Sequence, residues 1–109
     1  MIQKFYTLML LILFVASSAV AQNIVTVGDD DLVGGETYLW TNDNEYHLDG
    51  FVFLEEGGEL FIEQGTVIKG LADPSTDDLA SSLIITRDAK IFAQGTANQP
   101  IIFTTEVDD

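Results

Sequence analysis

Short runs in which apolar and polar residues alternate recur along most of the chain, with turn-forming residues between them. The runs are rich in β-branched and aromatic residues, as β-strands are, and the breaks are rich in Gly, Asn and Asp. No extended window after residue 21 shows a helical period. The pattern predicts strands at 24–27, 38–40, 46–48, 51–54, 59–62, 67–69, 83–86, 90–93 and 101–104.

The last six of these runs form two similar triplets. Corresponding members begin at 51 and 83, at 59 and 90, and at 67 and 101, so the spacing is nearly constant. The sequence Gln-Gly-Thr at 64–66 also recurs at 94–96. Self-similarity at such a period is typical of repeat proteins. We therefore expect a parallel β-solenoid of two three-strand coils, joined by a long loop at 70–82 and with a second excursion at 96–100. An antiparallel sandwich of short strands is the alternative, but it does not explain the repeated turn.

Stacking of the two triplets predicts which side chains lie above one another. Leu60 is expected over Ile91 and Ile62 over Ala93, inside the coil. Gly65 and Gly95 are expected to stack at one corner, where a sharp bend leaves little room for a Cβ. Thr66 and Thr96 would then form a hydroxyl ladder beside these two glycines.

Residues 1–21 have the three parts of a secretory signal peptide. Lys4 gives a positive start, residues 5–15 are nearly all apolar, and Ala19-Val20-Ala21 fits a cleavage site before Gln22. A membrane-spanning helix is the alternative, but the apolar run is short for a span of about 20 residues. The chain has no cysteine, so a lipoprotein anchor after residue 21 is not expected. These features predict export, with no membrane attachment after cleavage.

The charge of residues 22–109 narrows the possible partners. All 18 acidic residues lie in this segment against three of the four basic ones, so its net charge is −15 beside −14 for the whole chain. Such a surface repels phosphate backbones, and we therefore do not expect the protein to bind nucleic acid. Anionic lipids and anionic polysaccharides are disfavoured as partners for the same reason.

Residues 50–70, with the sequence GFVFLEEGGELFIEQGTVIKG, resemble the opening coil of secreted right-handed parallel β-helix proteins of the pectate-lyase-like fold. These proteins are common in Bacteroidota. Residues 89–104 are similar to that family's second coil, and residues 40–48 resemble its N-terminal capping stretch. The resemblance covers about residues 37–105. It implies an all-β, right-handed parallel β-helix at the outer surface of a Gram-negative bacterium or secreted from it.

The resemblance also implies a domain organisation. A signal peptide at 1–21 would be followed by a lead-in segment and N-terminal cap at 22–50 and by the first two coils at 51–109. Members of the family continue for many more coils, usually with a tryptophan-glycine-glycine stretch soon after the equivalent of Thr105. We therefore expect a fragment, whose remaining coils belong to the same polypeptide.

Candidate catalytic residues are few. His47 is the single histidine and lies in a capping strand, where a structural role is favoured over that of a general base. Glu55, Glu56 and Glu63 lie at turns, where solvated charge is the default. Polysaccharide lyases of this fold use basic residues and often calcium, and Arg87 and Lys90 are the local candidates.

Two acidic runs are candidates for a calcium site, since calcium prefers hard oxygen ligands on loops. Neither run has EF-hand spacing, and solvated acidic loops are the favoured alternative. The candidate ligands are Asp29, Asp30, Asp31, Asp73, Asp77 and Asp78.

Two phenylalanines are candidates for a binding face. If Leu60 and Ile62 point inward, alternation directs Phe61 outward, and Phe92 likewise. Stacked outward phenylalanines suit glycan stacking or protein docking. The alternative is that the loop at 70–82 or a neighbouring domain covers them.

These observations favour a non-enzymatic role. The expected function is that of an exported β-helix segment used at the cell surface for adhesion or glycan binding, with an extracellular glycan or a surface protein as partner. The alternative is the cap of a polysaccharide lyase or glycoside hydrolase whose active site lies in other coils. No cofactor is expected apart from the calcium considered above.

Overall fold

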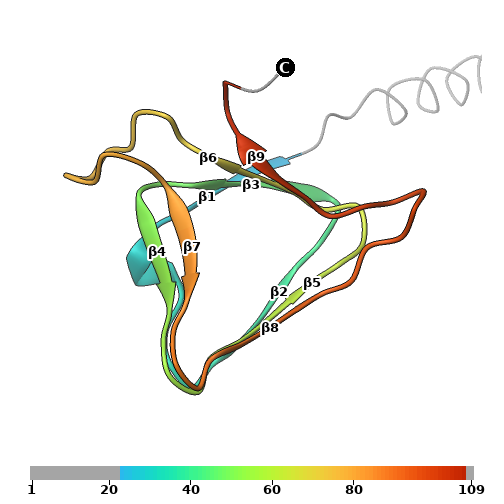
Figure 1. Cartoon of the computed structure of the whole chain (residues 1–109), viewed down its shortest axis with the longest axis horizontal. Helices are drawn as coiled ribbons and strands as arrows, with labels where there is room; N and C mark the ends of the chain where they lie inside the picture. The colour runs from blue at the N-terminus through green and yellow to red at the C-terminus, as the bar shows by residue number, and fades with distance from the viewer. Residues whose placement is uncertain (1–22, 108–109) are drawn as a thin grey trace, which may run out of the picture.

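The computed structural model describes residues 23–107, and these form three parallel sheets arranged around a triangular core (Figure 1). Sheet A has the strand order β1-β3-β6-β9, sheet B the order β2-β5-β8, and sheet C the order β4-β7. Every strand pair in them is parallel. The strands are β1 (Asn23–Val27), β2 (Thr37–Trp40), β3 (Asn44–Leu48), β4 (Phe51–Leu54), β5 (Glu59–Ile62), β6 (Val67–Gly70), β7 (Ser82–Ile85), β8 (Lys90–Ala93) and β9 (Ile102–Thr105).

The chain visits the three sheets in a constant order, C, B and A, and each circuit is one coil. One coil consists of β4, β5 and β6, and the next of β7, β8 and β9. The connections within a coil contain no helix, and each strand pairs with its counterpart one coil later. This is a parallel β-helix, and the predicted fold class is confirmed.

The lead-in segment and cap were predicted at 22–50, and the described part of this segment, residues 23–50, already contributes β1, β2 and β3 to these sheets. In place of a first strand in sheet C, this part of the chain has a short 3-10 helix, η1 (Asp29–Asp31). The predicted signal peptide at 1–21 lies outside the described residues. No helix in the described part of the chain is long and apolar enough to cross a membrane.

The core consists of inward side chains that stack in columns along the axis of the helix. Leu60 lies between Tyr38 of β2 and Ile91 of β8, and Ile62 pairs with Ala93, as predicted. Trp40 and Tyr46 stack with their ring centroids 4.7 Å apart, and the Tyr46 hydroxyl accepts a hydrogen bond from the Thr41 backbone. The buried apolar residues are Val27, Leu32, Trp40, Tyr46, Leu48, Val52, Leu54, Leu60, Ile62 and Ile68.

The predicted glycine and threonine ladders are wrong. The β5–β8 register pairs Ile62 with Ala93, whereas alignment of the two Gln-Gly-Thr copies would place Ile62 beside Phe92. Gly65 has a positive φ of 81° and faces Gln99 and Asn42, while Gly95 is outside the positive-φ region and lies against Pro100 and Ile101. The excursion after Gly95 removes the second copy from the stack.

Thr66 therefore has a different neighbour from the predicted one. Its carbonyl accepts a hydrogen bond from Ile102, which continues the β6–β9 register, so it does not stack on Thr96. Its side chain is fully buried, and its hydroxyl donates to the Glu63 carbonyl at 2.6 Å. This bond closes the turn between β5 and β6.

Candidate functional site

An outward column of apolar side chains crosses the flat face of sheet B. Leu39 of β2, Phe61 of β5 and Phe92 of β8 occupy equivalent register positions on successive coils. The Phe61 and Phe92 rings stack with centroids 4.6 Å apart and an angle of 12° between their planes. These three residues, called the outward column below, point away from the core because their strand neighbours Leu60 and Ile62 point into it.

The outward column is open to solvent. The exposed fractions are 64% for Leu39, 38% for Phe61 and 44% for Phe92. The loop predicted at 70–82, which was a possible cover for the phenylalanines, spans 71–81 and connects sheets A and C at another corner (Figure 1). Exposed aromatic rings in register on a rigid sheet are a preformed contact surface.

An open hollow lies against the two rings, and most of the residues that line it are apolar. Its volume is about 720 Å³, within the range of small-molecule sites. Glu63, Gln64 and Gln94 lie on its rim. Glu63 is held in place because its Oε1 accepts a hydrogen bond from the Asn42 backbone at 2.9 Å. The hollow thus combines apolar ring surface with amide and carboxylate groups that can bind hydroxyls.

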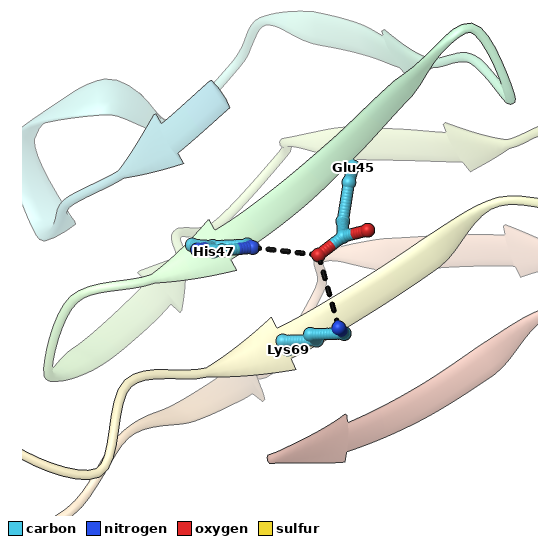
Figure 2. Close-up of polar contacts among 3 residues, drawn as sticks. All are labelled: Glu45, His47 and Lys69. Atoms are coloured by element: carbon cyan, nitrogen blue, oxygen red, sulfur yellow. Dashed lines mark hydrogen bonds and ion pairs between the residues drawn. The ribbon is translucent and has the colours of Figure 1, made fainter. Parts of the chain in front are cut away.

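A second candidate is a polar cluster on the outer face of sheet A (Figure 2). Glu45 and His47 lie two positions apart on β3, on the same face, and Lys69 of β6 pairs with His47. One carboxylate oxygen, Glu45 Oε1, lies 2.8 Å from His47 Nε2 and 3.2 Å from Lys69 Nζ. The side chains are 16% to 28% exposed.

The hydrogen bond from His47 is the largest influence on Glu45 and lowers the pKa of its carboxyl, with Lys69 acting in the same direction. The unfolded chain therefore binds this proton more readily than the folded one. The contacts of the Glu45 carboxylate therefore stabilise the folded state above the pKa that this carboxyl has in the unfolded chain. This stabilisation is lost as the pH falls through the pKa of Glu45 in the folded state.

At pH 7 we expect the free energy of unfolding of a Glu45→Gln variant to be lower than that of the wild type, by less than about 1 kcal/mol because the ion pair is partly exposed. At pH 3 the difference should become smaller. Urea unfolding at both pH values measures this. Glu56→Gln, which removes an exposed carboxylate without an ion-pair partner among the described residues, is the control. A Glu45→Gln variant that keeps the full acid sensitivity of the wild type would contradict the assignment.

The comparisons with known proteins assign the family. The family model of the pectate-lyase-like beta helix domain matches residues 34–109. The chain belongs to this family. No curated protein and no solved structure gave a match. Since members of one fold family can carry unrelated sites, function has to be argued from the residues of this β-helix.

Three of the six calcium candidates bind the backbone of this pectate-lyase-like β-helix. Asp29 Oδ1 accepts from the Phe53 N–H at 3.0 Å, and Asp78 Oδ2 accepts from the Phe51 N–H at 2.9 Å. Asp31 Oδ2 accepts from the Gly28 N–H at 2.7 Å. Asp29 and Asp78 thus accept the hydrogen bonds of backbone N–H groups at the free edge of β4, where η1 lies in place of a neighbouring strand.

The other three candidates, Asp30, Asp73 and Asp77, are exposed. The described residues contain no group of three or more His, Cys, Asp or Glu side chains placed to hold a metal ion. Asp49 also holds the acidic loop at 71–81 in place, because its carboxylate accepts hydrogen bonds from the backbone N–H and the hydroxyl of Ser75. These bonds lower the pKa of Asp49.

The remaining candidates are spread over the β-helix. Arg87 lies in the exposed turn between β7 and β8, and Lys90 opens β8, where it pairs with Glu59. Glu55 and Glu56 lie in the turn one coil earlier. Among the described residues, the structure brings none of these side chains to His47, whose partner is Glu45.

The Glu45–His47–Lys69 cluster was missed in the sequence. Its only local signal is the spacing of Glu45 and His47, which places both on one face of a strand. Lys69 joins them through the β3–β6 register, which a single sequence does not specify at that point.

Proposed function

We propose that this protein is an exported, non-enzymatic β-helix of a Gram-negative bacterium of the Bacteroidota type, and that its outward column binds neutral glycans at the cell surface. The observation that carries the proposal is the exposed, stacked pair Phe61 and Phe92 beside a hollow with amide groups on its rim. The signal-peptide pattern of residues 1–21 supports export.

The ring geometry defines how a sugar would contact this face. Phe61 lies between Leu39 and Phe92, so the stacked rings offer mainly their outer edges to solvent. A pyranose ring would lie across these edges, and Leu39 would extend the apolar strip. Gln64 and Gln94 would bind hydroxyl groups at the border of the sugar.

Charge selects the class of glycan. Polysaccharides with carboxylates or sulfates would be repelled by residues 22–109, whose net charge is −15, and Glu63 lines the hollow itself. Uncharged polysaccharides avoid this repulsion. No cofactor is needed for such binding, since ring contact and hydrogen bonds suffice.

Affinity electrophoresis tests the proposal. We expect the protein to be retarded in native gels that contain at least one of three neutral polysaccharides, galactomannan, β-glucan or dextran, and not in gels that contain polygalacturonate. Failure of all three neutral polymers to retard the protein would contradict glycan binding. Release of shorter sugars from any of the polymers during incubation would instead indicate an enzyme.

A further inference from the structure

A second hollow lies at the corner where the chain passes from sheet B to sheet A. Its volume is about 420 Å³. Three successive coils line it, because Asn42 follows β2, Gly65 follows β5, and residues 98–100 lie between β8 and β9. Ile102 completes the lining and points away from the core, since its strand neighbour Phe103 occupies the inward column of Ile68. This space, called the corner hollow below, therefore lies on the side of the β-helix.

The excursion at 96–100 is a closed turn that lies against this corner. Figure 1 shows it, in red, projecting sideways between β8 and β9. The Thr96 N–H donates to the Gln99 carbonyl at 3.1 Å, and the Gln99 N–H donates to the Thr96 hydroxyl at 3.0 Å. A Cβ added to Gly65 would lie 3.6 Å from Gln99 Cβ, so the turn packs beside the previous coil. These contacts fix the backbone of the excursion, while its Asn98 and Gln99 side chains are exposed.

The lining of the corner hollow suits a neutral, hydroxyl-rich ligand. Asn42, Asn98 and Gln99 contribute side-chain amides, and no charged residue lines the space. An amide has both donors and an acceptor, so it can bind neighbouring hydroxyl groups at the same time. Among the described residues, no hydrogen bond occupies the side-chain amides of Asn98 and Gln99. Both amides are therefore available to a ligand.

The corner hollow adjoins the hollow beside the outward column. Glu63 and Gln64 line the hollow at the rings, and the next residue, Gly65, lines the corner hollow. Asn42 joins the two walls, since its N–H donates to Glu63 Oε1 at 2.9 Å and its amide donates to the Gln64 carbonyl at 2.8 Å. Phe61 and Gly65 are four residues apart, so the chain between them spans at most about 14 Å. A run of linked sugars can therefore reach both hollows.

We propose that the ligand of this face is an extended polysaccharide chain that crosses the outward column and continues around the corner into the corner hollow. This inference rests on the glycan-binding function proposed above and adds a second binding position to it. One sugar unit lies on the edges of Phe61 and Phe92, and a later unit of the same chain gives its hydroxyl groups to Asn98 and Gln99. The site thus recognises a segment of a polymer, and a disaccharide fills only part of it.

Two positions on one chain make the affinity depend on chain length. Once the first sugar is bound, the second contact forms within the same complex, at a high effective concentration of the remaining chain. It therefore adds to the affinity without a second loss of translational freedom. The affinity should rise with the number of linked sugars until both positions are filled, and then level off.

Isothermal titration calorimetry with a disaccharide and a hexasaccharide from each of galactomannan, β-glucan and dextran tests the second position. For the polymer that the protein binds, we expect the hexasaccharide to bind at least tenfold more tightly than the disaccharide. The double variant Asn98→Ala/Gln99→Ala should lose at least tenfold in affinity for the hexasaccharide. It keeps both hydrogen bonds of the turn, which use the Gln99 backbone, so it should fold, and circular dichroism checks this.

A Gly65→Asn variant fills the corner hollow from its floor. Asparagine tolerates the positive φ of this position, and the nearest atom to an added Cβ is 3.6 Å away, so the turn should be kept. We expect the same loss of hexasaccharide affinity as in the double variant. Ser82→Ala, which removes an exposed hydroxyl on sheet C, is the control and should bind like the wild type.

The outcomes separate this inference from the proposed function. Wild-type hexasaccharide affinity in both the Asn98→Ala/Gln99→Ala and the Gly65→Asn variants would overturn the second position and leave glycan binding at the outward column in place. Equal affinity of the wild type for the disaccharide and the hexasaccharide would do the same. Failure of the wild type to bind any of the three intact polymers would overturn the glycan-binding function, and this inference with it.

Discussion

A Leu60→Ala variant is expected to lose about 2–5 kcal/mol of unfolding free energy, the range for a leucine removed from a packed core. Leu60 is fully buried in the central column of sheet B, with Tyr38 on one side and Ile91 on the other. Truncation of Leu60 leaves a cavity that the neighbouring strands cannot move in to fill, because β5 is hydrogen-bonded to β2 on one side and to β8 on the other. A domain with about 5–15 kcal/mol of total stability would be close to unfolding.

Leu39→Ala is the matched control for this prediction. It makes the same chemical change on the same sheet, at a side chain that is 64% exposed, and should cost no more than about 0.5 kcal/mol. Urea unfolding followed by circular dichroism measures both variants. Similar losses for the two leucines would contradict the assignment of inward and outward faces.

A Gly50→Ala variant is expected to lose about 2–3 kcal/mol, from two separate causes. Gly50 has a φ of 83°, a conformation that costs an alanine about 1–2 kcal/mol. A Cβ at this position would also lie 2.5 Å from Thr76 Oγ1 and 2.6 Å from Asp78 Oδ2. The loop would have to move, and the hydrogen bond from Phe51 to Asp78 would be lost.

Gly35→Ala separates the two causes. Gly35 has nearly the same φ, 79°, but no atom lies within 4 Å of an added Cβ. We expect this variant to lose only the conformational part, about 1–2 kcal/mol. The difference between the two variants in urea unfolding measures how firmly the loop at 71–81 is seated on the corner. Equal losses would show that the loop contributes nothing there.

Periodicity predicted the fold because each coil repeats the same alternation. The columns of Leu60 over Ile91 and Ile62 over Ala93 follow from matching the two triplets, and the structure has both. The same reasoning failed at Gly95, because the second Gln-Gly-Thr comes one position early relative to the strand register and an excursion follows it. Short motifs report a similar turn without fixing its register.

The candidate sites were predictable only in part. The outward direction of Phe61 and Phe92 follows from the alternation of side chains along a strand, but their exposure depends on where the loop at 71–81 lies. The roles of Asp29 and Asp78 could not be foreseen, because they satisfy the edge of β4, which is distant from both in sequence. Clustered aspartates suggest metal binding in a sequence, whereas in this structure Asp29 and Asp78 accept hydrogen bonds from backbone N–H groups at the edge of β4.

Isothermal titration calorimetry with the neutral polysaccharide that retards the wild type most strongly tests the central claim, that the outward column is a glycan-binding face. The account predicts that the double variant Phe61→Ser/Phe92→Ser loses at least tenfold in affinity. The control Ile24→Ser/Val33→Ser, which removes two exposed apolar side chains elsewhere, should bind like the wild type. Wild-type affinity in the phenylalanine double variant would contradict the account.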